Sequence, residues 1–123
     1  MPDTDATQPP PPVQPDLVVL VRDLMFSTRI GHAARDAGVA AKFVRDPARL
    51  AEVAGKRLVV DLSQPGCLEA AVEWQGRTGG HVVGFVSHVD TATIQAARSA
   101  GLDAVLPRSA FVTKLGQIVS PPA

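Results

Sequence analysis

Three short runs of apolar residues constrain what this chain can fold into more than any other feature. The runs are residues 17–21 (LVVLV), 57–60 (RLVV) and 81–86 (HVVGFV). A continuous apolar run of this length is typical of a β-strand that is covered on both faces, as the strands of a parallel sheet are. We therefore predict a sheet with helices packed against both of its sides.

Amphipathic segments alternate with these runs. In residues 27–37, apolar side chains recur at i, i+3, i+4 and i+7, which places them on one face of a helix. The other segments predicted to be helical are residues 46–55, 67–78, 90–101 and 109–119. Three of the helices are expected to begin at an N-cap residue, namely Ser27, Asp46 and Asp90.

Two weaker runs, residues 40–44 (AAKFV) and 104–106 (AVL), complete a set of five predicted strands. Strands that alternate with helices favour the α/β class, and five of them fit a flavodoxin-like, doubly wound (βα)5 parallel sheet with strand order 2-1-3-4-5. Lys42 in the second strand and the shortness of the fifth strand predict that these two strands form the edges of the sheet.

The ends of the sequence differ from the predicted domain in composition. Residues 1–15 are rich in proline and lack apolar periodicity, so we predict a disordered, extended tail there. Residues 120–123 are a second, short tail. A single domain is predicted between them, over residues 16–119.

The overall composition excludes several classes of function. The chain has 12 basic and 12 acidic residues, so no positive excess points to a nucleic-acid partner. Its one cysteine, Cys67, cannot form an internal disulfide, which favours a cytoplasmic location. No apolar run approaches the ~20 residues of a membrane span, and the first residues do not resemble a signal peptide.

Polar residues follow four of the five predicted strands at the point where each strand ends. They are Arg22 and Asp23, Asp61 and Ser63, Ser87 and His88, and Arg108. In a sheet of this kind, the carboxyl ends of the strands form the edge where ligands bind. Asp23 and Asp61 are expected side by side, because the first and third strands are neighbours.

The ordered set of these segments resembles the receiver domain of bacterial response regulators, over residues 16–119. The segment LVVDLSQPG resembles the family's aspartate-x-x-x-proline-glycine motif, and VGFVSH resembles its fourth strand, which ends in Thr or Ser. AGLDAVLPRSAF resembles the segment that carries an invariant Lys. The resemblance implies that Asp61 is the phosphoacceptor, with Ser87 as the hydroxyl residue and Arg108 at the lysine position.

The sequence departs from the family at the residues that hold Mg²⁺. The family has two adjacent acids after the first strand, and here Arg22 precedes Asp23. Asp23, Asp61 and the backbone carbonyl of Ser63 remain as a weak ligand set for Mg²⁺, which prefers oxygen ligands. Arg22 would repel the metal or replace its charge. No organic cofactor is implied.

Three further features bear on the expected function. Val105 stands where the family has a switch aromatic residue. His88 follows Ser87, where its imidazole would hinder water at Asp61 or respond to protonation. The apolar segment from Leu24 to Phe26 has two possible roles: it is exposed and contacts a partner, or it folds back over the edge of the sheet.

We therefore expect a stand-alone receiver-like signalling domain of the two-component, or phosphorelay, type, degenerate and acting through protein–protein contacts. The resemblance implies a histidine kinase or a downstream protein as its partner. It also allows a homodimer through the face made by the fourth helix, fifth strand and fifth helix. An enzyme is not expected, since the adjacent Ser87 and His88 side chains diverge on an extended segment. The alternative is a flavodoxin-like protein that binds a nucleotide or flavin.

Overall fold

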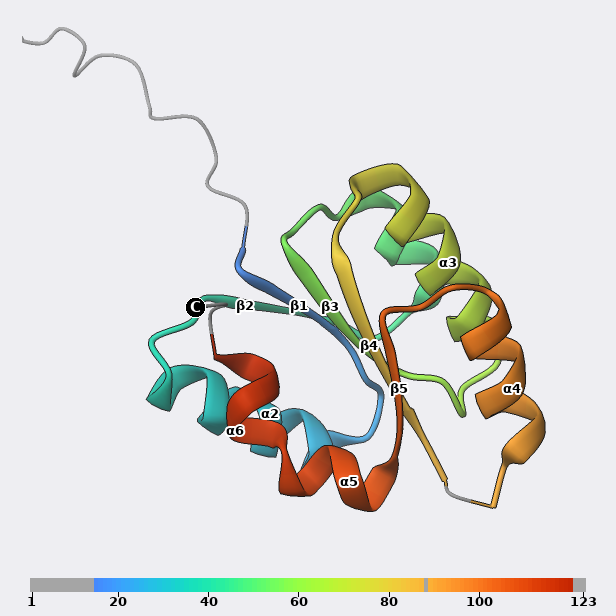
Figure 1. Ribbon diagram of the computed structural model, residues 1–123. Coiled ribbons are helices and arrows are strands. Elements are labelled where there is room, and N and C mark those ends of the chain that lie inside the picture. Colours follow the sequence, from blue (N-terminus) through green and yellow to red (C-terminus); the bar gives the residue numbers. More distant parts are fainter. Residues whose placement is uncertain (1–14, 88, 121–123) are drawn as a thin grey trace, which may run out of the picture.

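The computed structural model describes residues 15–87 and 89–120, which form five parallel strands and the helices between them (Figure 1). The prolines of the predicted N-terminal tail up to residue 14, His88, and residues 121–123 of the C-terminal tail lie outside the described residues. The strands are β1 (Leu17–Leu20), β2 (Ala41–Val44), β3 (Arg57–Asp61), β4 (His81–Val86) and β5 (Ala104–Pro107).

The sheet confirms the predicted flavodoxin-like topology. Its strand order is β2-β1-β3-β4-β5, and every neighbouring pair is parallel. Leu20 of β1 is paired with Val60 of β3, and Asp61 is paired with Phe85 of β4. The carboxyl ends of β1, β3 and β4 are thus neighbours. The outermost strands of the sheet are β2 and β5, as predicted.

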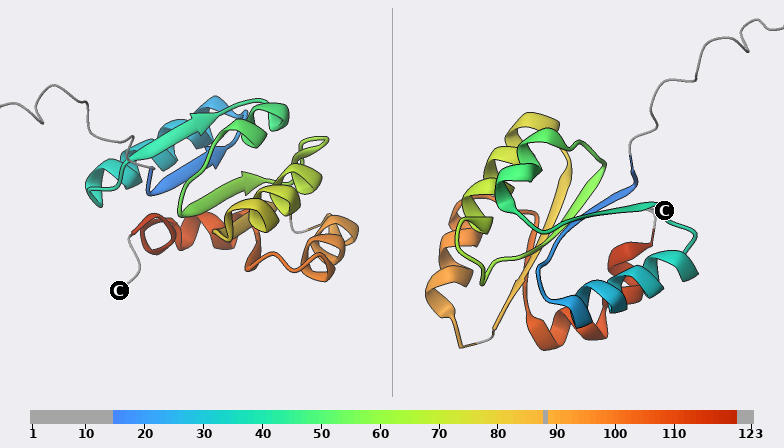
Figure 2. Two further views of the ribbon diagram at one scale, coloured as in Figure 1. Left: turned by 90° about the horizontal axis from the view of Figure 1, so that it is seen from above. Right: turned by 180° about the vertical axis from the view of Figure 1, so that it is seen from behind.

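Helices cover both faces of the sheet (Figures 1 and 2). One face carries α2 (Leu24–Asp36), α5 (Arg108–Thr113) and α6 (Leu115–Val119). The other carries η1 (Pro47–Glu52), α3 (Cys67–Thr78) and α4 (Thr91–Ser99). Side chains alternate between the two apolar cores along each central strand, with Leu58 and Val60 on the α3 side and Val59 on the α2 side. No helix of the described residues is long and apolar enough to cross a membrane.

The start of α2 differs from the prediction. The helix begins at Leu24 and not after Ser27, because Asp23 is its N-cap: Asp23 Oδ1 accepts a hydrogen bond of 3.0 Å from the backbone N–H of Phe26. Ser27, the predicted cap, lies inside the first turn, and its hydroxyl donates to the carbonyl of Val21 at 3.2 Å. Asp23 lies one helical turn before Ser27, and its negative carboxylate interacts more favourably with the helix N-terminus than a hydroxyl does.

Two other predicted helices also form differently. Residues 47–52 make a 3₁₀-helix, although Asp46 caps it as predicted, through a bond of 2.9 Å from the N–H of Ala48. The predicted helix over 109–119 is divided at Lys114 into α5 and α6. After the division, α6 packs against α2.

Arg57, the first residue of β3, holds the end of α6. Its guanidinium donates to the carbonyls of Ile118, Val119 and Ser120 at 2.5, 2.8 and 2.6 Å. These are among the carbonyls that a helix leaves without partners at its C-terminus. Burial lowers the pKa of Arg57, and the negative charge of Asp16 partly offsets this shift. The guanidinium nevertheless keeps its charge, as arginines in proteins do.

Gly84 in β4 makes room for Leu62, the residue after the end of β3. A Cβ atom at position 84 would lie 2.5 Å from Leu62 Cδ1. We expect Gly84→Ala to lower the free energy of unfolding by about 1–3 kcal/mol, measured by urea denaturation, because the buried Leu62 must shift. Gly76→Ala is the matched control. Position 76 is helical with open space around it, so this change should raise stability by about 0.5–1 kcal/mol.

Arg57→Lys tests whether the guanidinium fastens α6 to the sheet. A lysine keeps the charge but cannot reach three carbonyls from one planar group, so we expect a loss of about 1–3 kcal/mol. Hydrogen exchange should accelerate in α6 more than in the central strands. Arg98→Lys is the control, since Arg98 makes one long bond of 3.5 Å to the Val105 carbonyl. Equal effects of the two changes would contradict this role for Arg57.

Candidate functional site

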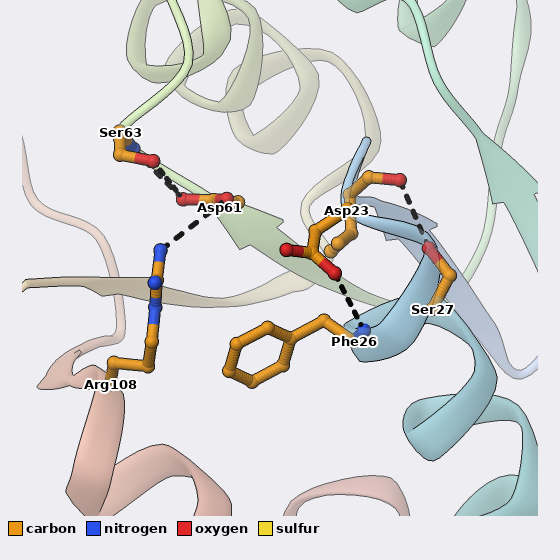
Figure 3. Close-up of polar contacts among 7 residues, drawn as sticks. Asp23, Phe26, Ser27, Asp61, Ser63 and Arg108 are labelled. Atoms are coloured by element: carbon orange, nitrogen blue, oxygen red, sulfur yellow. Dashed lines mark hydrogen bonds and ion pairs between the residues drawn. The ribbon is translucent and has the colours of Figure 1, made fainter.

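Asp61 is the last residue of β3. Its surface is 1% exposed, and among the residues that the structure describes no other acidic residue is buried. Its Oδ1 atom accepts hydrogen bonds from the backbone N–H of Ser63 at 3.0 Å and from the Ser63 hydroxyl at 2.6 Å (Figure 3). These bonds close the turn that follows β3, as short acidic side chains commonly do. One oxygen of this carboxylate is therefore engaged by its own loop.

The other oxygen of Asp61 faces Arg108, which comes from the opposite side of the site. Arg108 is the first residue of α5, and its Nη2 atom lies 4.0 Å from Asp61 Oδ2. The Arg108 guanidinium also lies over the ring of Phe26, 5.2 Å from the ring centre. Its Nε atom is buried and makes no hydrogen bond within residues 15–87 and 89–120. The cation is thus held by an aromatic face and one carboxylate.

Phe26 is the residue of the site that the sequence did not identify. Its ring stacks on Phe85 of β4 with 5.2 Å between centres, and Phe85 stacks on Phe111 of α5 at 4.3 Å. Phe26 therefore folds back over the sheet edge, while its neighbours Leu24 and Met25 are 71% and 78% exposed. The folded-back alternative thus holds for Phe26, and contact of Leu24 and Met25 with a partner stays a prediction. The sequence signal for this position was the spacing of three residues between Asp23 and Phe26. An N-cap at Asp23 bonds the N–H of Phe26 and places its ring toward the sheet.

The strand pairing brings Asp23 to the strand end beside that of Asp61. Its carboxylate, however, is bound to the N-terminus of α2, as Figure 3 shows. Arg22 is exposed, and its carbonyl accepts a bond of 3.1 Å from Arg45. In the parts of the chain that the structure describes, no group of three or more His, Cys, Asp or Glu side chains is arranged to hold a metal ion.

The predicted magnesium ligands therefore fit a metal poorly. Asp23 is occupied as a helix cap, and Asp61 receives donors from Ser63 on one oxygen and faces a guanidinium on the other. Ser63 turns its N–H toward Asp61. A hard cation would have to replace these protein donors before it gained its usual oxygen ligands.

Of the remaining predicted residues, Ser87 lies at this edge. Ser87 follows β4, is half-buried, and accepts a bond of 3.0 Å at its carbonyl from the N–H of Asp90, the N-cap of α4. His88 falls outside the described residues. Val105 is buried on the α3 side of β5, away from Asp61. The link between β1 and α2 consists of residues 21–23.

Cys67, the first residue of α3, is buried close to this site. Burial raises the pKa of its thiol to about 11, and the negative charge of Asp61 adds to the effect while Arg22 opposes it. The thiol is therefore protonated at neutral pH. It is a packing residue of the α3 core and not a nucleophile.

The fold is similar to that of solved response regulators. The phosphorylated cyanobacterial phytochrome response regulator RcpA matches with a TM-score of 0.68 and 18% identity, over 87% of this chain and 89% of that one. The BeF3-activated DrrB receiver domain matches with a TM-score of 0.73 and 14% identity, over 87% and 95%. A response regulator protein from Burkholderia pseudomallei with a phosphorylated aspartic acid, a calcium ion and citrate gives 0.66 and 14%, over 83% and 69%.

No protein-family model matches the sequence, and no curated protein matches it. At identities of 14% to 18%, the structural likeness establishes the fold. The chain therefore has the receiver-domain fold: one flavodoxin-like α/β domain with an aspartate at the carboxyl end of its central strand.

The raised pKa of Cys67 predicts a dependence of stability on pH. In the unfolded chain the thiol ionises near pH ~8.5, and in the folded chain at about 11. Between these values the unfolded state loses the proton first, so the free energy of unfolding should fall as pH rises. Urea denaturation at about pH 8 and about pH 10.5, on either side of most of this window, measures the fall. Cys67→Ser lacks the group, so its stability should fall less; an identical fall would contradict the assignment.

Proposed function

We propose that the protein is a receiver-like signalling domain of the two-component type, in a degenerate form that acts through protein–protein contacts. It works without a phosphoryl cycle at Asp61 and without enzymatic turnover. The proposed setting is the cytoplasm, and the proposed partner is a histidine kinase or a downstream protein. The receiver-domain fold and the position of Asp61 support the class.

The observation that carries the degenerate form is that Ser63 engages one oxygen of Asp61 while a guanidinium, at 4.0 Å, faces the other. Ser63 donates two hydrogen bonds to Oδ1, and Arg108 faces Oδ2. An aspartate that attacks a phosphoryl donor needs a free oxygen, and the transferring group needs cations that are free to stabilise its charge. Here the cation, Arg108, lies 4.0 Å from Asp61 Oδ2 and over the ring of Phe26, and its fixed guanidinium replaces the point charge of a lysine.

The second support is the replacement of an acid by Arg22 beside the engaged Asp23. Phosphoryl transfer to a carboxylate places several negative oxygens in one site, and a divalent cation usually offsets them. With a single, capping acid and an arginine after β1, the site has little attraction for such a cation. The proposed role therefore does not depend on Mg²⁺.

Exposed apolar side chains at the same edge support a role in protein contact. Leu24 and Met25 in the first turn of α2 are 71% and 78% exposed, and Val89 before α4 is 73% exposed. All three follow the carboxyl ends of strands, so they border the Asp61 edge. Large apolar side chains that gather on a surface commonly mark interaction sites. Association of two copies through α4, β5 and α5 is a further proposal of the same kind.

The test is incubation of the full chain with acetyl phosphate and Mg²⁺, followed by intact-protein mass spectrometry. We expect no gain of a phosphoryl group, because Asp61 and Arg108 engage each other and the metal site lacks an acid. A gain that disappears in Asp61→Asn would overturn the degenerate form and leave a working receiver. Asp36→Asn, an exposed position on α2, is the control for a change of charge alone.

A double variant provides the complementary test, in which phosphorylation is expected to appear. Arg22→Asp with Arg108→Lys restores the acid pair and the point charge of the resembled family. We expect this variant to bind Mg²⁺ in calorimetry and to gain one phosphoryl group at Asp61. The control, Arg29→Asp with Arg98→Lys, makes the same changes away from the site and should gain neither. If both double variants stay unmodified, the two arginines are not what blocks the chemistry.

A further inference from the structure

The break between α5 and α6 leaves part of the sheet uncovered. After Lys114 the chain turns toward α2, and Arg57 fastens the end of α6 there. A pocket of about 810 Å³ opens between α6 and the first halves of β4 and β5. Figure 1 shows α6 beside α2 and away from β5.

The floor of the pocket is apolar. Val83 of β4, Ala104 and Leu106 of β5, and Ile118 of α6 line it. These residues belong to or pack against the α2-side core, yet Ala104, Leu106 and Ile118 stay partly exposed. The volume falls within the ~300–1,000 Å³ that is common for small-molecule sites. The floor can therefore bury the apolar part of a small molecule.

The rim of the pocket is cationic. Lys56, Arg57 and Lys114 line it against a single carboxylate, Asp16. Lys56 lies 3.5 Å from Asp16, and both side chains are well exposed, so this pair is weak. Arg57 is committed to the carbonyls of α6, which leaves the ammonium groups of Lys56 and Lys114 to meet a ligand.

We propose that this pocket binds a small amphipathic anion, such as a medium-chain carboxylate. The apolar chain lies on Val83, Leu106 and Ile118, and the anionic head meets Lys114 and Lys56 at the rim. The site is separate from Asp61: Arg57, His81 and Ala104 are the first residues of their strands, whereas Asp61 ends β3. The inference is therefore independent of the proposed signalling role.

The test is an NMR titration of the full chain with decanoate, kept below its micelle concentration. We expect saturable shifts of the amide signals of Val83, Leu106 and Ile118, with little change at Asp61 and Ser63. Decanol has the same chain without the charge and should bind more weakly. Shifts that gather at the Asp61 edge, or equal affinity for decanol, would overturn the proposal.

Two variants test the rim. Lys114→Glu should weaken decanoate binding at least about fivefold, since it replaces an attraction by a repulsion. Lys42→Glu makes the same change on exposed β2, outside the pocket, and should leave the affinity unchanged. Equal weakening by both would mean that net charge alone acts, which contradicts a built site.

The test must also separate a small-molecule ligand from occupation of the pocket by the chain's own acidic N-terminal residues. The double variant Asp3→Asn, Asp5→Asn distinguishes the two, because it removes both acids before the domain without touching the pocket. Without ligand, its signals at Val83, Leu106 and Ile118 should match those of the unchanged chain. Displaced signals at these residues would assign the pocket to the N-terminal segment and overturn the proposal.

Discussion

Burial of the central strands on both faces is the constraint on which the rest of this structure depends. β1, β3 and β4 place apolar side chains alternately into two cores, so neither face can be left to water. Helical crossovers supply both covers, and such crossovers make neighbouring strands parallel. Parallel strands end at the same edge. Asp61, Asp23 and Ser87 therefore gather at one place as a consequence of packing, before any chemistry is considered.

The same packing determines the state of Asp61. A buried carboxylate is stable only when hydrogen bonds and an opposite charge compensate for lost water. Ser63 supplies the bonds from the next turn, and Arg108 supplies the charge from α5. Phe26 then holds the guanidinium by its ring face. Compensation from within the chain therefore makes this aspartate part of the packing at this edge of the sheet.

The elements that the sequence predicted well are those decided by local pattern. The five strands, α3 and the caps Asp46 and Asp90 follow from apolar runs and from side chains that bond within a few residues. The failures lie where two local choices competed. Asp23 displaced Ser27 as a cap, and a periodic segment over 109–119 broke at Lys114, because α6 gains its contact with α2 and its bonds from Arg57.

The sequence by itself determined the α/β class, the strand order and the set of polar residues at the carboxyl edge, since each follows from hydrophobic periodicity and the rules of parallel sheets. Only the tertiary structure decided which of those residues engage one another. Phe26 reaches Phe85 and Arg108 across separate elements, and Arg108 reaches Asp61 in the same way. Such contacts depend on helix position and side-chain direction, which distant residues set together and no single stretch of sequence encodes.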